Sequence, residues 1–216
     1  MTDERIFQSA LESIIEGNPE IAIEVAKKAL EAGIEPNEMI DKGFVPGIME
    51  VGERFEEGIL FLPELMKAAD TMKEAIAILN EALATAGGKK RSAGKFLIAT
   101  VESDIHDIGK GIVASLLVAN GFEVIDLGRD VSNTVILEKA VEYEVDIIGT
   151  SSLLTTTMVQ QQYLENMLKE KELKGKFKTI VGGAPVTVRW ANRIGADAFA
   201  ENAADGVTKA LELLGK

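Results

Sequence analysis

The chain contains one histidine, His106, and no cysteine. The histidine belongs to the segment Asp104-Ile105-His106-Asp107-Ile108-Gly109, so a carboxylate lies two positions before the imidazole and a glycine three positions after it. An imidazole whose second ring nitrogen is oriented by a carboxylate suits a metal ligand. One histidine cannot build a zinc cage. A metal that arrives with most of its ligands, as in a tetrapyrrole-like cofactor, needs only one axial protein ligand and matches this inventory.

A simpler interpretation of the same segment stays open. Asp104 could cap a helix N-terminus together with Asp107, and Gly109 and Gly111 could only loosen the first turn of that helix. A phosphate-binding P-loop is excluded, because an aspartate stands where a glycine is needed and Lys110 is followed by glycine. The dinucleotide-binding fingerprint also fails.

Two further segments carry residues suited to a ligand. Six hydroxyl side chains occur within the eight positions 150–157. As a group they favour a polar pocket for a cofactor side chain, although for any single hydroxyl a helix cap or a turn is the more common role. At Gly182-Gly183, the backbone could approach a bulky group closely, or the two glycines could form a tight turn.

The elements that must position these residues alternate between short apolar runs and helical patterns. Strands are predicted at Phe96–Val101, Glu123–Leu127, Asp146–Ser151, Thr179–Val181 and Ala198–Ala200. Helices are predicted at Ile108–Asn120, Asn133–Glu144, Met158–Lys171, Val188–Ile194 and Ala203–Leu214. This alternation predicts a flavodoxin- or Rossmann-like, doubly wound, five-stranded parallel sheet, which binds ligands at the carboxyl ends of its strands.

The N-terminal part has only helical patterns. One helix ends at Gly17-Asn18-Pro19, a second runs from Pro19 to about Ala32, a third starts near Pro36, and a fourth runs from Pro63 to about Ala84. Four helices with short connections predict a four-helix bundle. The predicted organisation is a helical domain over 1–88, a polar glycine-containing linker over 89–94, and an α/β domain over 95–216.

Charge and hydropathy exclude several classes of function. The net charge is −12, which disfavours nucleic acid and anionic membranes as partners. Residues 1–86 carry −11 of this charge; their acidic surface could dock a protein partner or only promote solubility. The sequence has no long apolar run and no signal-peptide pattern, so a cytoplasmic location is expected.

Taken together, these motifs resemble a known family. The pattern Asp104-x-His106-x-x-Gly109, the segment with Ser151 and Thr155, and Gly182-Gly183 look like the cobalamin-binding domain of corrinoid methyltransferase proteins. The preceding bundle resembles the helical cap of that family, through Val51-Gly52-Glu53-Arg54-Phe55 and Phe61-Leu62-Pro63-Glu64. The whole chain is similar to the cap plus B12-binding modules of methionine synthase.

The resemblance implies roles for individual residues around cobalamin or a related cobamide. His106 would be the axial ligand to cobalt and would displace the cofactor's own benzimidazole base, which enters a slot in the sheet domain. Asp104 would hydrogen-bond His106, and Thr157 would continue this relay. The other cofactor-binding positions implied are Gly109, Ser151, Thr155, Gly182 and Gly183 in the sheet domain, and Phe55 and Leu62 in the cap.

Phe55 and Leu62 would cover the reactive upper face of the corrinoid. Both could instead be ordinary bundle core, and Leu65 or Met66 could share the role. Pro63 predicts a helix start, so Phe55 and Leu62 are not expected on one continuous helix.

The resemblance also implies a function. The protein would be a methyl carrier without catalysis of its own, which accepts a methyl group on cobalt(I) and passes it on from methyl-cobalt(III). Its partners would be a substrate-specific methyltransferase, an acceptor methyltransferase acting on coenzyme M or tetrahydrofolate, and a reductive activator. The match favours a methylamine substrate, with methanol and methoxy-aromatic systems as alternatives.

Three rival interpretations fit the sequence less well. A cobalamin-dependent sensor would need an output module, for which the remaining residues offer no motif. A mutase small subunit shares the Asp-x-His-x-x-Gly pattern but is not expected to carry this helical cap. A flavodoxin-like domain without a corrinoid does not easily explain three coincident loop motifs.

Overall fold

The computed structural model describes residues 3–85 and 92–215 and divides the chain into two compact units. One unit extends to Ser92 and includes the turn Val118–Gly121; the other consists of Ala93–Leu117 and Phe122–Lys216. Residues 89–91 of the linker predicted at 89–94 lie outside the described residues, and Gly94 is the first residue of a strand. None of the helices in the described ranges is long and apolar enough to span a bilayer.

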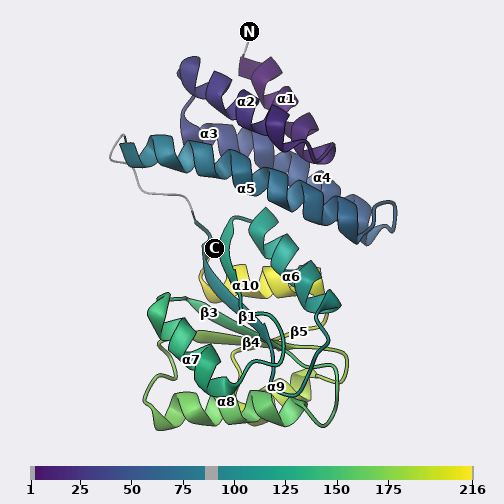
Figure 1. The fold of residues 1–216 in the computed structure, drawn as a ribbon, viewed down its shortest axis with the longest axis vertical. Coiled ribbons are helices and arrows are strands. Elements are labelled where there is room, and N and C mark those ends of the chain that lie inside the picture. Colours follow the sequence, from purple (N-terminus) through teal and green to yellow (C-terminus); the bar gives the residue numbers. More distant parts are fainter. Residues whose placement is uncertain (1–2, 86–91, 216) are drawn as a thin grey trace. The chain divides into compact units, whose positions relative to one another are not determined.

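The first unit is entirely helical (Figure 1). Its elements are α1 (Asp3–Ile15), α2 (Pro19–Glu31), α3 (Pro36–Met39), the π-helical turn η1 (Ile40–Phe44), α4 (Val45–Glu56) and α5 (Leu62–Thr85). The predicted stops and starts are present: Asn18 caps α2 by accepting a hydrogen bond from the Ile21 amide at 3.2 Å, and Pro19 occupies its first turn. The third predicted helix is the continuous run of α3, η1 and α4.

Small residues let the helices of this unit approach closely. Ala10 on α1 and Ala22, Ala26 and Ala29 on α2 are fully buried. A Cβ atom at Gly47 on α4 would lie 2.7 Å from the carbonyl oxygen of Leu11, so α1 and α4 touch backbone to backbone there. Larger side chains fill the remaining core, among them Ile14, Phe44, Leu65, Met72 and Leu79.

The second unit is a five-stranded, fully parallel sheet in the order β2-β1-β3-β4-β5. Its strands are β1 (Gly94–Thr100), β2 (Phe122–Asp126), β3 (Ile147–Ser151), β4 (Lys178–Gly182) and β5 (Ala198–Ala200). Its helices are α6 (Ile108–Ala119), α7 (Asn133–Glu142), α8 (Met158–Glu170), α9 (Val188–Ile194) and α10 (Ala203–Leu213). The predicted fold class, a helical cap followed by a doubly wound parallel sheet, is confirmed.

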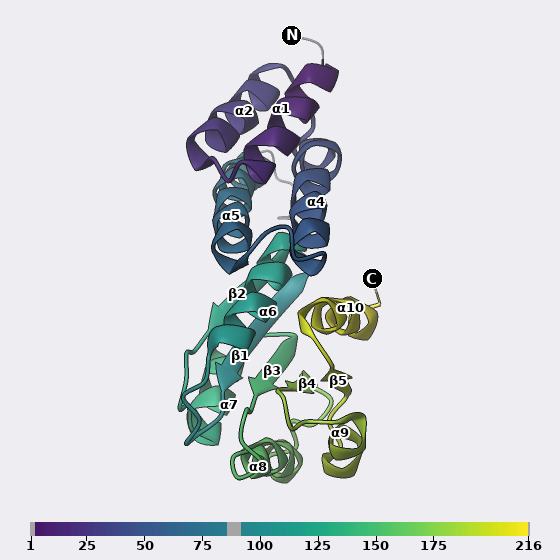
Figure 2. The ribbon, with the colours of Figure 1, turned by 90° about the vertical axis from the view of Figure 1, so that its right-hand side faces the viewer.

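Alternation along the strands assigns a different set of helices to each sheet face. Leu97, Ala99 and Ile148 form one core cluster with residues of α7 and α8. The neighbouring positions Phe96 and Ile98 point to the opposite face, which carries α6 and α10 (Figure 2). Both faces of a parallel sheet are normally covered, so any space left beneath α6 and α10 is a candidate binding cavity.

Candidate cofactor site

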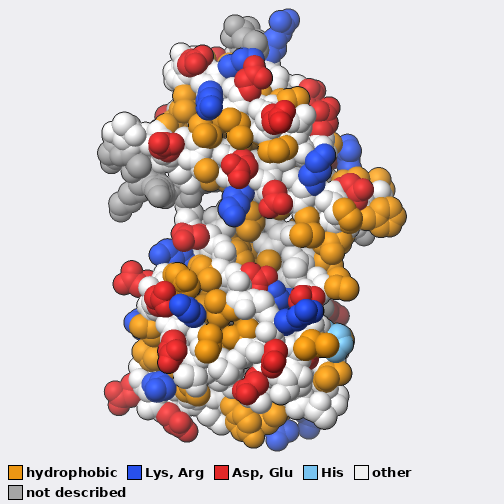
Figure 3. All heavy atoms as spheres, viewed as in Figure 1, with side chains coloured by type: hydrophobic (Ala, Val, Ile, Leu, Met, Phe, Trp, Pro, Cys, Tyr) orange, Lys and Arg blue, Asp and Glu red, His pale blue; other side chains and the backbone are white. Residues whose placement is uncertain are grey.

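The loop that follows β1 presents His106 to solvent beside a buried carboxylate. The His106 side chain is 46% exposed (pale blue in Figure 3), whereas Asp104 is fully buried. The Oδ1 atom of Asp104 lies 2.7 Å from His106 Nδ1 and also accepts a hydrogen bond from the His106 amide at 3.1 Å. Because an ionised carboxylate only accepts hydrogen bonds, Nδ1 carries a proton, and Nε2 is the nitrogen whose lone pair the neutral ring offers to a metal.

The other oxygen of Asp104 is held by the segment between β3 and α8. Its Oδ2 atom accepts hydrogen bonds from the Leu153 amide at 2.7 Å and from Thr157 Oγ1 at 2.8 Å. The hydroxyls of Thr157 and Ser152 lie 2.8 Å apart and are both buried. The loops after β1 and β3 are therefore joined through one carboxylate.

These donors determine the ionisation of Asp104. Burial alone raises the pKa of this carboxyl group, but the hydrogen bonds from the His106 ring, the Leu153 and His106 amides and Thr157 outweigh it and hold the pKa well below its ordinary range. At neutral pH the group is a buried anion that stabilises positive charge on the neighbouring imidazole.

Three residues that the sequence did not single out hold the backbone of this loop. Thr100 Oγ1 donates to the His106 carbonyl oxygen at 2.9 Å, and Arg129 Nη1 donates to the Ile105 carbonyl oxygen at 3.4 Å. Asp130 accepts a hydrogen bond from the Ser103 amide at 2.7 Å. Gly128-Arg129-Asp130 directly follows the second strand, and this position at the carboxyl edge of the sheet was the available signal.

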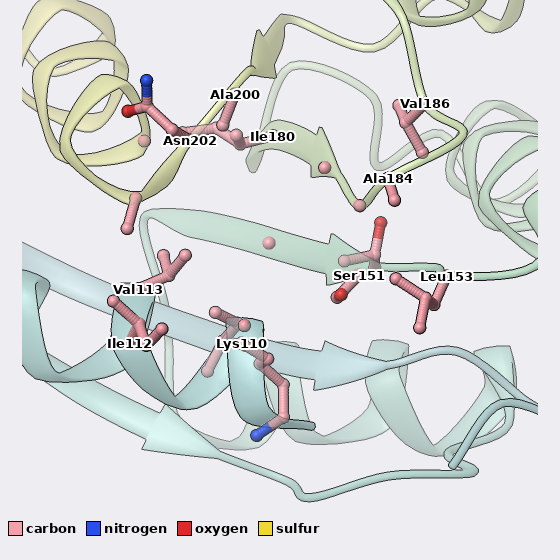
Figure 4. Close-up of a pocket in the computed structure, with 18 of the residues that line it drawn as sticks. Lys110, Ile112, Val113, Ser151, Leu153, Ile180, Ala184, Val186, Ala200 and Asn202 are labelled. Atoms are coloured by element: carbon pink, nitrogen blue, oxygen red, sulfur yellow. The ribbon is translucent and has the colours of Figure 1, made fainter. Parts of the chain in front are cut away.

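A cavity of about 1110 Å³ lies next to this loop, over the sheet face that carries α6 and α10 (Figure 4). It is larger than the range of roughly 300–1,000 Å³ typical of small-molecule sites. Small residues contribute much of its wall; those from the loop, strands and helices include Gly109, Gly149, Ser151, Gly182, Gly183, Ala184, Ala200 and Gly206. The α6 residues Ile112 and Val113 lie across the cavity from Ser151 and Ala184 in Figure 4.

The carboxyl ends of β3 and β4 approach so closely that one position excludes any side chain. Gly183 has φ of +118°, and a Cβ atom there would lie 1.9 Å from the carbonyl oxygen of Ser152. The glycine pair thus forms a tight turn and also lies against the cavity, so both interpretations of this segment describe its geometry.

The predicted site residues of the sheet unit separate into three groups. His106, Gly109, Ser151, Gly182 and Gly183 line the cavity. The relay residues Asp104 and Thr157 lie buried behind His106. Thr155 is exposed in the turn before α8 and is not among the residues that line the cavity.

Phe55 and Leu62 lie in the helical unit, on α4 and at the start of α5, and both are partly buried. The helix break expected from Pro63 is present, since α4 ends at Glu56 and α5 begins at Leu62. The connection between these helices also exposes Ile59 and Phe61, at 61% and 68%.

The donor set fits a metal that brings its own equatorial ligands. Within residues 3–85 and 92–215, no three histidine, cysteine, aspartate or glutamate side chains are grouped to hold an ion. His106 instead offers one oriented nitrogen beside a cavity large enough for an organic group. A corrinoid with one axial protein ligand and a bulky side chain satisfies both observations.

Comparison with known proteins gives consistent matches over nearly the whole chain. A family model described as a B12 binding domain matches residues 94–210, and a second model with the same description matches residues 6–80. The trimethylamine corrinoid protein 1 of Methanosarcina mazei is 48% identical over 206 residues, which cover 95% of each chain. The dimethylamine corrinoid protein of Methanosarcina barkeri is 46% identical over 99% of this chain and 100% of its own.

A solved structure extends this similarity to three dimensions. The methanol:cobalamin methyltransferase complex MtaBC from Methanosarcina barkeri matches 98% of this chain and 80% of its own, with a TM-score of 0.85 and 31% identity. The chain therefore belongs to the corrinoid proteins of methylamine and methanol methyltransferase systems, which combine a helical cap with a B12-binding α/β domain.

Proposed function

We propose that this protein is a methyl carrier in which His106 Nε2 is the axial ligand to the cobalt of a bound corrinoid. The observation that carries the proposal is the hydrogen bond of 2.7 Å between His106 Nδ1 and the buried Asp104, which leaves Nε2 as the free ligand atom beside the cavity. The cavity between α6 and α10 then receives the lower base and its tail. Ser151, Gly182 and Gly183 form part of its wall.

When bound, the corrinoid supplies a cobalt centre that accepts a methyl group from one molecule and gives it to another. The chain's own contribution is to tune the ligand. Asp104 stabilises positive charge on the imidazole whether the ring is bound to metal or protonated at Nε2. Thr157 and the Leu153 amide hold Asp104 in place, so the carboxylate would keep its orientation toward the ring when the ring binds the metal.

A methylamine is the favoured methyl donor. Relatives named for trimethylamine and dimethylamine are 48% and 46% identical to this chain, whereas the matched methanol system is 31% identical. The partners in this proposal are a methyltransferase that acts on the amine, a second methyltransferase for coenzyme M or tetrahydrofolate, and a reductive activator. A cytoplasmic location, Thr155 as a contact to the tail, and Phe55 and Leu62 as a cover for the upper face stay predictions.

The test begins with the whole chain reconstituted anaerobically with hydroxocobalamin. Reduction followed by methyl iodide should change the visible spectrum from that of the reduced to that of the methylated corrinoid. The reduced protein is then mixed with purified trimethylamine, dimethylamine or methanol methyltransferase and the matching substrate. Methylation with an amine system supports the proposal, methylation only with methanol corrects the substrate, and bound corrinoid that no system methylates contradicts it.

A further inference from the structure

The buried face of helix α8 carries one uncharged polar side chain, the amide of Gln161, among residues that are apolar or ion-paired. The buried residues of α8 are Gln161, Leu164, Glu165 and Leu168. Leu164 and Leu168 belong to the core cluster on the sheet, and Glu165 forms an ion pair with Lys174 at 2.8 Å. Gln161 is 1% exposed. A buried amide destabilises the fold unless it is hydrogen-bonded, so its partners indicate what it holds together.

The Gln161 amide bridges two strands. Its Nε2 atom donates to the carbonyl oxygens of Thr150 on β3 at 3.1 Å and of Gly182 on β4 at 3.2 Å. Its Oε1 atom accepts a hydrogen bond from Trp190 Nε1 at 3.0 Å. Two carbonyl acceptors on one side and an indole donor on the other determine which way the amide faces.

The two strands joined by Gln161 form part of the cavity wall. The pairing of β3 with β4 ends at Ser151 and Gly182. Ser151, Gly182 and the following Gly183 all line the cavity. Because α8 packs on the face that carries Leu97 and Ala99, Gln161 holds the strand ends from the side of the sheet opposite the cavity.

The same strand ends connect to the predicted axial ligand. The carbonyl oxygen of Gly182 also accepts a hydrogen bond from the Ser152 amide at 3.1 Å. The Ser152 hydroxyl lies 2.8 Å from Thr157 Oγ1, which donates to Asp104. A change in the separation of β3 and β4 would therefore alter both the cavity wall and the hydrogen bonds that connect Ser152 and Thr157 to Asp104.

We propose that Gln161 is a positioning residue that sets the separation of the β3 and β4 ends, so that the cavity between them and α6 accepts the nucleotide tail of the corrinoid. Trp190 supports it by fixing the amide. This inference rests on the proposed placement of the tail in the cavity. It concerns affinity for the tail, independently of whether the bound corrinoid is methylated.

The test compares two probes, hydroxocobalamin and cobinamide, which is the corrinoid without the nucleotide tail. Their dissociation constants are measured by spectral titration of the whole wild-type chain, Gln161→Met and Trp190→Phe. Gln161→Met keeps the length of the side chain and removes its hydrogen bonds. Gln162→Met, the same change one residue along α8, is the matched control. Thermal unfolding of each apo variant is recorded in parallel.

Gln161→Met should weaken cobalamin binding about tenfold, the factor expected from one or two neutral hydrogen bonds, and change cobinamide binding less than about twofold. Trp190→Phe should act in the same direction with a smaller change, and Gln162→Met should alter neither affinity. The inference would be overturned if Gln161→Met lost the same affinity for both probes, or lost affinity for neither. It would also fail if the wild type bound cobinamide as tightly as cobalamin. A wild type that selects cobalamin but is not methylated would contradict the methyl-carrier proposal and leave this inference intact.

Discussion

At the scale of single residues, the ligand properties of His106 depend on a carboxylate whose two oxygens face different parts of the chain. Oδ1 of Asp104 faces the histidine, and Oδ2 faces Leu153 and Thr157, about fifty positions later in the sequence. The sequence predicted the pairing of Asp104 with His106 and the contribution of Thr157. It did not identify Thr100 or Gln161, because both donate to backbone carbonyl groups and no side-chain pattern marks them. For Arg129, the position after the second strand was the only signal.

Replacing the proposed ligand should weaken retention of the corrinoid. In His106→Ala, we expect the affinity for hydroxocobalamin to fall by at least about tenfold and the visible spectrum of the oxidised protein to change. Glu102→Gln, an exposed change in the same loop, is the control and should leave both unchanged. Identical spectra for His106→Ala and the wild type, in both oxidised and reduced forms, would contradict axial ligation.

The hydroxyl of Thr157 can be tested without any cofactor. Thr157→Val keeps the shape of the side chain but removes a donor to the buried Asp104 carboxylate, so the free energy of unfolding of the apo protein should fall by about 1–2 kcal/mol. Thr157→Ser retains the hydroxyl and should recover most of that difference. The measurement is urea unfolding at neutral pH. Equal stability of the valine variant and the wild type would show that the hydrogen bond contributes nothing.

At the scale of elements, periodicity and stop signals predicted the strands, the helices and the break near Pro63. They did not predict the π-helical turn Ile40–Phe44 between α3 and α4. Pro46 follows this turn and has no amide hydrogen to give to an α-helical partner, so the chain inserts a wider turn ahead of it. Such a turn adds a single residue to the helical period, and the apolar spacing of one short segment does not locate it.

The junction of β3 and β4 has no room for a methyl group at Gly183. Gly183→Ala would place Cβ against the Ser152 carbonyl oxygen in a backbone conformation with positive φ, so we expect a loss of stability of roughly 2–4 kcal/mol. Gly111→Ala on α6 is the control, since a Cβ atom there meets nothing within 4 Å and alanine favours the helix. Thermal unfolding of both variants measures the difference. Similar stability of the two would contradict the close approach at Gly183.

At the scale of the whole molecule, most of the net negative charge lies in residues 1–86. The sheet unit contains a cluster of charged and polar side chains at the amino ends of its strands, away from the cavity. Lys174 contacts Glu165 at 2.8 Å and Asp197 at 3.1 Å, and Asp197 also accepts a hydrogen bond from the Thr179 hydroxyl at 2.9 Å. Burial raises the pKa of Asp197, but the bonds from Lys174 and Thr179 outweigh it and lower the pKa overall. Burial lowers the pKa of Lys174, but Glu165 and Asp197 outweigh it and raise the pKa overall.

These opposite shifts predict how stability depends on pH. Because the pKa of Asp197 is lower in the folded protein, its ionised form stabilises the fold at every pH above its unfolded pKa, which is near 4. This stabilisation is lost as the pH falls through the folded pKa. Because the pKa of Lys174 is higher in the folded protein, its charged form stabilises the fold at every pH below its unfolded pKa, which is near 10.4. This stabilisation is lost as the pH rises through the folded pKa. Asp197→Asn should therefore lower the free energy of unfolding by roughly 1–3 kcal/mol across about pH 5–9, and by less at either extreme.

Urea unfolding between pH 3 and pH 11 measures this difference. The control is Glu170→Gln on α8, an exposed carboxylate whose removal should have no such effect. A difference between Asp197→Asn and the wild type that is the same at pH 3 and pH 7 would contradict the assignment.

Because the chain has a single imidazole, the loop after β1 carries its own spectroscopic label. Selective nitrogen-15 labelling of histidine would give one ring spin system in the entire protein, which needs no assignment by mutagenesis. The proton-bearing Nδ1 beside Asp104 and the bare Nε2 differ strongly in chemical shift, so the tautomer can be read directly from the apo protein. The Nε2 resonance would then report directly whether the proposed corrinoid binds at this ring.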